Sequence, residues 1–224
     1  MKGRPLFFGA IVVLLVALLS ASAYAQTDDL FGAVMAGTPQ DVQAAIDKGA
    51  DVNAHQAEGG MTPLIAAAKY NPNLEVIAIL LKAGADMNAQ DTQYGATALM
   101  YAAEYSKTPE VVTTLLKAGA DIAARDSVHD ATALVFAAEF NQNPDLITTL
   151  LEAGADVKTQ SKDGGTALMW AAKGNNPKVI MVLLNAGADV KAKDNIGNTA
   201  LSYAKYNSQL AGTDALKKLE EASK

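Results

Sequence analysis

The tripeptide Gly-Ala-Asp recurs along this chain of 224 residues, and its spacing limits the possible fold more than any other feature. The intervals between successive copies are 35, 35, 35 and 33 residues, and the copies begin at Gly49, Gly84, Gly119, Gly154 and Gly187. A fixed period of about 20 to 50 residues is the mark of proteins built from stacked structural units. The sequence therefore predicts a stack in which each unit contacts mainly its neighbours.

Two further series keep step with the tripeptide. A Thr-(Pro/Ala)-Leu segment opens at Thr62, Thr97, Thr132, Thr166 and Thr199. A Thr or Asn lies eleven residues before each glycine, at Thr38, Asn73, Thr108, Asn143 and Asn176, and four of the five precede a proline. Thr and Asn cap helix N-termini, and proline suits the first helical turn because it has no N–H to leave unbonded. Two helices are therefore expected in each repeat.

The spacing of apolar residues sets the expected helix lengths. A second helix of about ten residues begins after Asn73 and ends before Gly84, where glycine can adopt the left-handed conformation that terminates helices. A first helix runs from Thr97 to about Tyr105 in the clearest copy. The segment 121–130 is polar and shows little helical periodicity, so it is expected to form an extended turn or hairpin between repeats.

At these residues the chain resembles the ankyrin repeat family. The family's T-P-L-H-x-A opening corresponds to 62–67 (TPLIAA), 97–102 (TALMYA) and 166–171 (TALMWA), and its Gly-Ala-Asp-Val-Asn corresponds to 49–53. The resemblance covers about residues 27 to 222. It implies an all-α repeat solenoid of stacked helix-turn-helix repeats joined by hairpin-like loops.

The chain departs from the family pattern in two ways. Most repeats are 35 residues long against the family's 33, with about one extra residue in the turn between the helices and one in the hairpin. The family histidine is absent from every copy, where the chain has Ile65, Met100, Val135, Met169 and Ser202. The hydrogen bonds that this histidine makes to the turn must therefore be replaced or lost.

About six layers account for residues 26–224 as a single ankyrin-repeat domain. An N-terminal layer (27–60) is expected to precede four full repeats (61–95, 96–130, 131–165 and 166–198) and a capping layer (199–224). The capping layer should present a polar outer face through Asp214, Lys217, Lys218, Glu220 and Glu221. Solenoids need such polar ends to remain soluble.

Residues 1–25 have the layout of a cleavable signal peptide. Lys2 and Arg4 precede an apolar run over 6–19, and Ala23-Tyr24-Ala25 fits the small-residue cleavage site. An uncleaved membrane anchor is the alternative, since 6–25 reaches the ~20 residues that a spanning helix needs. Cleavage after Ala25 predicts a periplasmic or secreted protein with no stable membrane insertion, and the sequence does not separate these two locations.

Charge and residue content exclude several functions. Cleavage would leave 16 basic and 24 acidic residues, a net charge of −8 that should repel the phosphates of nucleic acid. The chain has no cysteine, its only histidines are His55 and His129, and motifs for nucleotide phosphates, hydrolase nucleophiles or metals are absent. The sequence therefore predicts no enzyme activity and no cofactor.

One aspartate recurs in each layer, at Asp51, Asp86, Asp121, Asp156 and Asp189. These carboxylates could form a ladder of cation ligands, or each could bind backbone N–H groups of its own turn. Layers ~8 to 10 Å apart would keep the carboxylates from converging on one ion, which favours the local bonds and no metal site.

Aromatic residues recur at one position of successive first helices, namely Tyr101, Phe136, Trp170 and Tyr203. Stacking would align them as a stripe, unless they pack between the layers instead. By resemblance, the first helices and the hairpin tips form a concave face, with contacts at the positions after the paired alanines. The partner-binding candidates are Lys69, Tyr70, Tyr101, Glu104, Tyr105, Phe136, Glu139, Phe140, Trp170, Lys173 and Tyr203.

Two functions follow from such a face. The first is a monomeric protein-interaction module or adaptor that binds another protein, whose identity the sequence does not give, because tyrosine and tryptophan dominate protein-binding hot spots. The second is a binder of a small molecule or an envelope polymer such as a sugar, with the aromatic stripe as a stacking platform. We favour the first, since small ligands usually need a deeper pocket than an ankyrin groove offers.

Overall fold

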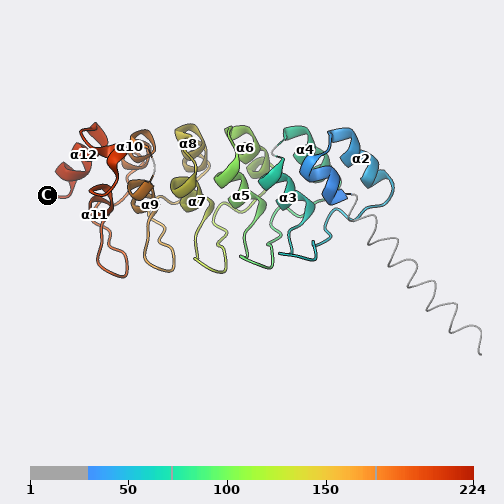
Figure 1. Ribbon diagram of the computed structural model, residues 1–224, viewed down its shortest axis with the longest axis horizontal. Helices are drawn as coiled ribbons and strands as arrows, with labels where there is room; N and C mark the ends of the chain where they lie inside the picture. The colour runs from blue at the N-terminus through green and yellow to red at the C-terminus, as the bar shows by residue number, and fades with distance from the viewer. Residues whose placement is uncertain (1–29, 72, 175) are drawn as a thin grey trace, which may run out of the picture.

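The computed structural model describes residues 30–71, 73–174 and 176–224, which form two rows of helices and one row of loops (Figure 1). The predicted signal segment 1–25 lies outside these residues. Among the described residues, no helix combines the length and the apolar character needed to cross a membrane.

The helices of each repeat fall into separate rows, which confirms the all-α repeat solenoid. Each helix packs against the next member of its own row and against its partner in the same repeat. The first helices are α3 (Pro63–Tyr70), α5 (Ala98–Tyr105), α7 (Ala133–Phe140), α9 (Ala167–Gly174) and α11 (Ala200–Ala204). The other row holds α2 (Pro39–Asp47), α4 (Leu74–Lys82), α6 (Pro109–Lys117), α8 (Pro144–Glu152), α10 (Pro177–Asn185) and α12 (Asp214–Ala222). Residues 30–36 are also helical, and a short 3-10 helix, η1, spans Ser208–Leu210.

Local capping explains where these helices begin and end. The Thr97 side chain accepts a hydrogen bond from the Met100 N–H, and the Asn143 side chain accepts one from the Asp145 N–H. Thr132 caps α7 through its backbone conformation without such a side-chain bond. At the other end, Gly119 has a φ of 100°, a conformation that costs residues with a Cβ atom energy. The predicted helix starts and stops are thereby confirmed.

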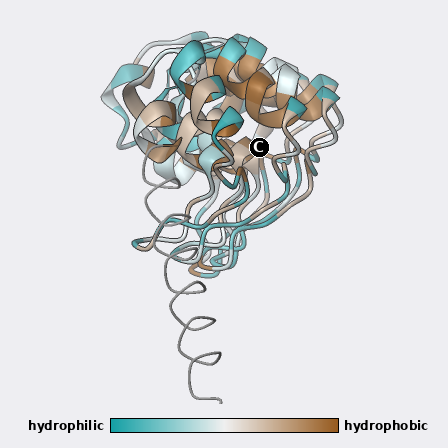
Figure 2. Cartoon of the chain, turned by 90° about the vertical axis from the view of Figure 1, so that its right-hand side faces the viewer, coloured by the Kyte–Doolittle hydropathy of each residue, from teal (hydrophilic) through white to brown (hydrophobic). Residues whose placement is uncertain are grey.

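The hydrophobic core lies between the two rows of helices, where the apolar segments gather in Figure 2. Leu99, Ala102 and Ala103 of α5 are buried, as are Val112 and Leu115 of α6. The paired alanines recur in α3, α5, α7 and α9 and let successive first helices pack closely, because a methyl group takes little room between helices.

The aspartates of the Gly-Ala-Asp series bond locally. In every copy a carboxylate oxygen accepts a hydrogen bond of 2.9 Å from the N–H two residues further on, as Asp121 does from Ala123. This confirms the prediction that each of these aspartates binds backbone N–H groups of its own turn.

A second series of acidic residues holds the loops where the family histidine is missing. The buried Asp91 accepts hydrogen bonds from the N–H groups of Gln93 and Tyr94 and from the hydroxyl of Tyr101. Asp194 accepts equivalent bonds from loop N–H groups and from the Tyr203 hydroxyl. The loop is thus stabilised by a carboxylate of its own.

Asparagines at the start of the lengthened helix-helix turn connect one layer to the next. Asn141 is buried, and its side-chain amide donates to the carbonyls of Ala103 (3.0 Å) and Ser106 (2.9 Å) in the preceding repeat. Asn207 donates in the same way to the carbonyl of Ala172, at 3.2 Å. The longer turn therefore places polar side chains that satisfy helix-end carbonyls of the neighbouring layer.

The connecting loops form a continuous row below the helices in Figure 1. Antiparallel bridges between Gln90 and Thr97 and between Gln160 and Thr166 give two of the loops hairpin character. Backbone hydrogen bonds join each loop to the next, from Thr92 to Gly59, Ser127 to Tyr94, Lys162 to His129 and Asn195 to Asp163, donor first. The loops are therefore ordered relative to one another.

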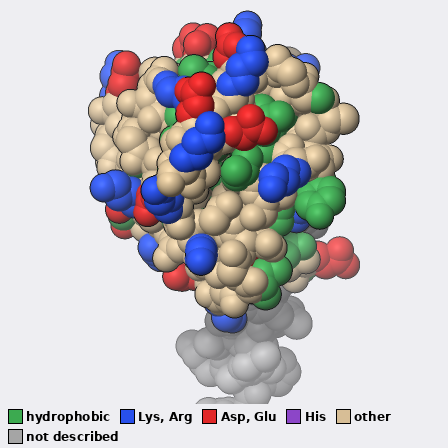
Figure 3. Space-filling model, turned by 90° about the vertical axis from the view of Figure 1, so that its left-hand side faces the viewer, with side chains coloured by type: hydrophobic (Ala, Val, Ile, Leu, Met, Phe, Trp, Pro, Cys, Tyr) green, Lys and Arg blue, Asp and Glu red, His purple; other side chains and the backbone are tan. Residues whose placement is uncertain are grey.

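The C-terminal end of the stack is covered by α12. This helix buries Ala215 and Leu219 and exposes Lys217, Glu220 and Glu221. Figure 3 views this end, where charged side chains lie spread between smaller groups of hydrophobic ones. The helix has the polar outer face expected of a cap, whereas the exact layer boundaries stay a prediction.

Candidate functional site

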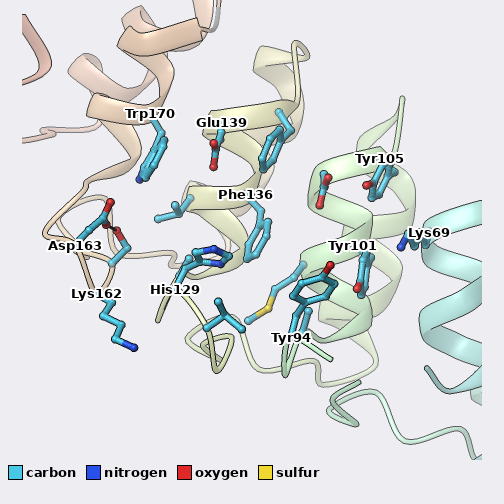
Figure 4. Close-up of a pocket in the computed structure, with 18 of the residues that line it drawn as sticks. Lys69, Tyr94, Tyr101, Tyr105, His129, Phe136, Glu139, Lys162, Asp163 and Trp170 are labelled. Carbon is cyan, nitrogen blue, oxygen red and sulfur yellow. Dashed lines mark hydrogen bonds between the residues drawn. The ribbon is translucent and has the colours of Figure 1, made fainter. Parts of the chain in front are cut away.

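A groove with a volume of about 700 Å³ lies along the first helices and the loops that precede them (Figure 4). Side chains from four successive repeats line it. Its main lining residues are Lys69, Tyr94, Tyr101, Glu104, Tyr105, His129, Phe136, Glu139, Phe140, Lys162, Asp163 and Trp170. We refer to this site as the groove.

The structure brings most of the predicted binding residues together in the groove. Lys69, Tyr101, Glu104, Tyr105, Phe136, Glu139, Phe140 and Trp170 all line it. Tyr70, Lys173 and Tyr203 do not. Lys173 and Tyr203 instead line a small recess beside Trp170. Their roles in binding stay a prediction.

The aromatic side chains lie at two depths. Tyr101 is buried and its hydroxyl donates to Asp91 at 2.7 Å, so it forms the floor and fixes the loop. Burial and the Asp91 carboxylate raise the pKa of Tyr101, which keeps the phenol protonated. Tyr105 stacks beside it, with ring centroids 6.3 Å apart, yet is 46% exposed. Tyr101 is thus packed inside the fold, whereas Tyr105 remains accessible to a binding partner.

The exposed aromatic row occupies the last position of successive first helices. Tyr70, Tyr105 and Phe140 end α3, α5 and α7, and they are 46%, 46% and 50% exposed. Gly174 ends α9 and terminates the row. Apolar residues exposed together on adjacent elements, unlike single exposed ones, are typical of interaction surfaces.

Trp170 is accommodated by a glycine on the neighbouring loop. A Cβ atom at Gly165 would lie 2.6 Å from the indole Nε1, whereas alanine occupies this position at Ala96 and Ala131, in repeats whose ring is smaller. The indole N–H is buried and has no hydrogen-bond partner among the described residues. The single tryptophan is therefore a tightly fitted wall of the groove.

Charged side chains divide the groove into two ends and a centre. At one end, the Lys69 Nζ lies 5.0 Å from the centroid of the Tyr101 ring, and at the other the Lys173 Nζ lies 4.8 Å from that of Trp170. Glu104 and Glu139 lie between them, both half-buried. Burial raises the pKa of Glu139, Glu104 and Asp163 raise it further, and Lys173 and His129 oppose the shift.

This shift gives a prediction for Glu139→Gln. Because the folded-state pKa of Glu139 is raised above the unfolded value, its contribution favours folding below about pH 4.5 and turns unfavourable as pH rises through the folded pKa. The variant should therefore raise the melting temperature at pH 7 and leave it nearly unchanged at pH 4, as measured by thermal denaturation. A lower melting temperature at pH 7 would contradict the prediction.

Glu110→Gln on α6 is the matched control. Hydrogen bonding to Thr108 lowers the pKa of Glu110, so removing its charge should not raise the melting temperature at pH 7. The two variants lose the same charge and differ in the sign of the expected effect.

The contribution of the loops to the groove was not predicted from the sequence. Tyr94, His129 and Asp163 reach it from successive loops. The position of His129 depends on Asp126, whose buried carboxylate accepts hydrogen bonds from the N–H groups of Val128, His129 and Ala131, and Asp91 holds the Tyr94 N–H in the preceding loop. The signal was present in the sequence, because Asp91, Asp126 and Asp194 recur at intervals of 35 and 68 residues, close to one and two repeats.

The side chains that line the groove are of kinds that serve in binding. His55 lies away from it and its ring nitrogen Nδ1 is 2.8 Å from the Gly60 carbonyl oxygen, while the His129 ring contacts Asp126. Within the described ranges, no three His, Asp or Glu side chains gather as metal ligands would. Aromatic faces, the carboxylates of Glu104, Glu139 and Asp163, and nearby lysines offer stacking, hydrogen bonding and charge complementarity.

Solved structures share this architecture. A chain in the complex of the Bd0816 predatory endopeptidase from Bdellovibrio bacteriovorus with the immunity protein Bd3460 is 30% identical, with a TM-score of 0.72. The alignment covers 86% of this chain and 97% of that chain. The ankyrin repeat domain of Bcl-3, of the IkappaB protein family, is 26% identical with a TM-score of 0.68 and covers 86% of this chain and 81% of that one.

The comparison of sequences leads to the same family. No curated protein matches the chain. A family model described as ankyrin repeats (3 copies) matches residues 30–126 and 134–222, which is most of the chain. Together with two rows of helices, glycine-terminated second helices and the ordered loop row, this match shows that the chain belongs to the ankyrin repeat family.

Proposed function

We propose that this protein is an exported, non-catalytic interaction module that holds a partner protein in the groove. Ankyrin repeats are protein-interaction scaffolds, and the observation that carries the finer proposal is the exposed row of Tyr70, Tyr105 and Phe140 beside the groove. Such side chains bury large areas with few torsions to immobilise, and so supply most of the energy of many interfaces.

Rigid placement of these side chains also supports a binding role. Tyr105 stacks on the buried Tyr101, whose hydroxyl is held by Asp91. Asn141 ties the end of α5 to the next repeat through its bonds to Ala103 and Ser106. Because the face is ordered before binding, little conformational entropy is lost when a partner docks.

The similarity to a chain of the endopeptidase–immunity protein complex favours a folded enzyme as the kind of partner. That similarity extends over nearly all of the related chain at 30% identity. A scaffold that occludes an enzyme needs a rigid surface and no chemistry of its own, which the groove provides. Export rests on the basic, apolar and small-residue pattern of residues 1–25 and places such a partner in the periplasm or outside the cell.

One observation favours a small ligand as the alternative. A volume of about 700 Å³ falls within the range of about 300 to 1,000 Å³ that is usual for small-molecule sites. Trp170 and Phe136 could then stack on a sugar ring. We rank this second, because the aromatic row continues to Tyr70, outside the groove, as a protein interface would require.

Site-specific cross-linking in cells tests the proposal. Benzoylphenylalanine in place of Phe140 should give a light-dependent adduct with one protein, recovered in the periplasmic or secreted fraction. The same probe in place of Leu74 is the control, because Leu74 is 41% exposed but belongs to α4 in the other row of helices. Equal adducts from both positions would refute binding in the groove.

The remaining outcomes are also informative. An adduct found only in the cytoplasm would refute export. Absence of any protein adduct, together with quenching of Trp170 fluorescence by an envelope sugar, would replace the protein partner by the small ligand.

A further inference from the structure

We infer, building on the proposed function, that the groove selects a partner segment carrying a lysine or arginine, whose cationic group pairs with Glu104 or Glu139. The inference concerns the chemistry of the partner. It can fail while the groove remains a protein-binding site.

The two glutamates are placed one repeat apart along the groove. They occupy the same position of α5 and α7, which pack side by side, and both line the groove. The axes of packed helices are about 8 to 10 Å apart, so each carboxylate would pair with its own cationic group and one cation would not bridge the two. Figure 4 shows Glu139 directed into the space between α7 and α9.

Neither carboxylate is neutralised by the fold. In the part of the chain that the structure describes, no lysine, arginine or histidine nitrogen lies within 4.0 Å of Glu104 or Glu139. Lys162 lines the same groove but points away from Glu139 in Figure 4. Half-buried carboxylates without an ion-pair partner are costly, and burial raises the pKa of Glu139 accordingly.

Two lysines, Lys69 in the groove and Lys173 in the recess beside it, show how these rings receive cations. Lys69 lies over Tyr70 and Tyr101, and Lys173 lies over Trp170, all within 5.1 Å of the ring centroids. Across the described residues, no such cation lies over the central rings of Tyr105, Phe136 or Phe140. An incoming lysine or arginine would therefore find a carboxylate beside uncovered ring faces, a combination that strengthens cation binding.

Charge selects among possible partner segments. The whole chain has a net charge of −6, and Asp163 adds a third carboxylate to the groove lining. An acidic segment would be repelled, and a neutral one would leave Glu104 and Glu139 desolvated without compensation. Among these classes, only a basic side chain would interact with either of the two carboxylates more favourably than water does.

Peptide sets with one fixed residue test this inference. The purified protein is applied to immobilised nine-residue peptides with uncharged, mixed flanks and arginine, lysine, citrulline or glutamate at the centre. Citrulline matches arginine in shape but has no charge. The arginine and lysine sets should retain at least tenfold more protein than the citrulline and glutamate sets.

Matched variants locate the effect. Glu104→Gln combined with Glu139→Gln should reduce the preference for arginine over citrulline to less than twofold. Glu110→Gln combined with Glu152→Gln removes the same charge from α6 and α8 of the same repeats and should keep the preference. Equal retention of the arginine and citrulline sets, retention of no set, or a preference that survives the first pair would overturn the inference.

A variant without the aromatic row separates this failure from failure of the proposed function. If the parent protein is retained by all peptide sets without charge preference and Tyr105→Ala/Phe140→Ala abolishes this retention, the groove binds peptides but does not select cations. Retention that is insensitive to both sets of variants would refute the groove itself.

Discussion

Asp126→Ala is expected to lower the free energy of unfolding by about 3 to 4 kcal/mol, although Asp126 lies in a loop. Its side chain is only 2% exposed, and its two oxygens accept hydrogen bonds from three backbone N–H groups between Val128 and Ala131. Alanine would leave these donors without an acceptor in a region that water reaches poorly. Urea denaturation followed by circular dichroism measures the loss.

Two companion variants give this prediction its contrast. Asp121→Ala removes a carboxylate that accepts a single N–H at the surface and should cost about 1 kcal/mol. Asp126→Asn keeps one acceptor oxygen and should fall between the two. If Asp126→Ala costs no more than Asp121→Ala, the loop is not held by this carboxylate.

The combined substitution Tyr105→Ala/Phe140→Ala is expected to weaken binding of the cross-linked partner at least about 100-fold, since each hot-spot aromatic contributes about 2 kcal/mol. Both side chains are about half exposed in the free protein, so the free energy of unfolding should change by only about 1 kcal/mol. Isothermal titration calorimetry with the identified partner measures the affinity, and thermal denaturation verifies the fold.

Tyr206→Ala is the control for that measurement. Tyr206 is 91% exposed but does not line the groove, so its loss should leave the affinity within twofold. An unchanged affinity for the double variant would mean that the partner binds elsewhere on the solenoid.

The helices could be predicted from the sequence because the signals that start and stop them are local. Thr97 caps the helix that follows it, and Gly119 ends the one before it, whatever the rest of the chain does. The repeat period then indicated that successive pairs of helices stack on one another. The same reasoning assigned Asp121 to its own turn, as the structure confirms.

The depth of each aromatic side chain could not be predicted in this way. Tyr101 and Tyr105 lie one turn apart on α5, yet one is buried and the other is half exposed. The difference arises because the loop before α5 folds back over Tyr101. Asp91 of this loop accepts a hydrogen bond from the Tyr101 hydroxyl. That contact depends on the course of the loop, for which the residue pattern of the helix carries no information.

The groove likewise depends on contacts between repeats. Tyr94 and His129 belong to different loops and reach one site only because the Lys162 N–H bonds the His129 carbonyl and the Ser127 N–H bonds the Tyr94 carbonyl. Asn141 fills a comparable role between helices. The sequence shows that these residues recur, but their partners lie one repeat away.

The row of loops is joined by far weaker links than the rows of helices. Adjacent first helices share broad apolar surfaces, whereas backbone hydrogen bonds such as those donated by Thr92, Ser127, Lys162 and Asn195 join the loops. The solenoid should therefore be stiffer along its rows of helices than along its row of loops. Bending of the stack should therefore open these four backbone hydrogen bonds first, so the hydrogen-exchange rates of the four amides are expected to report on changes in curvature.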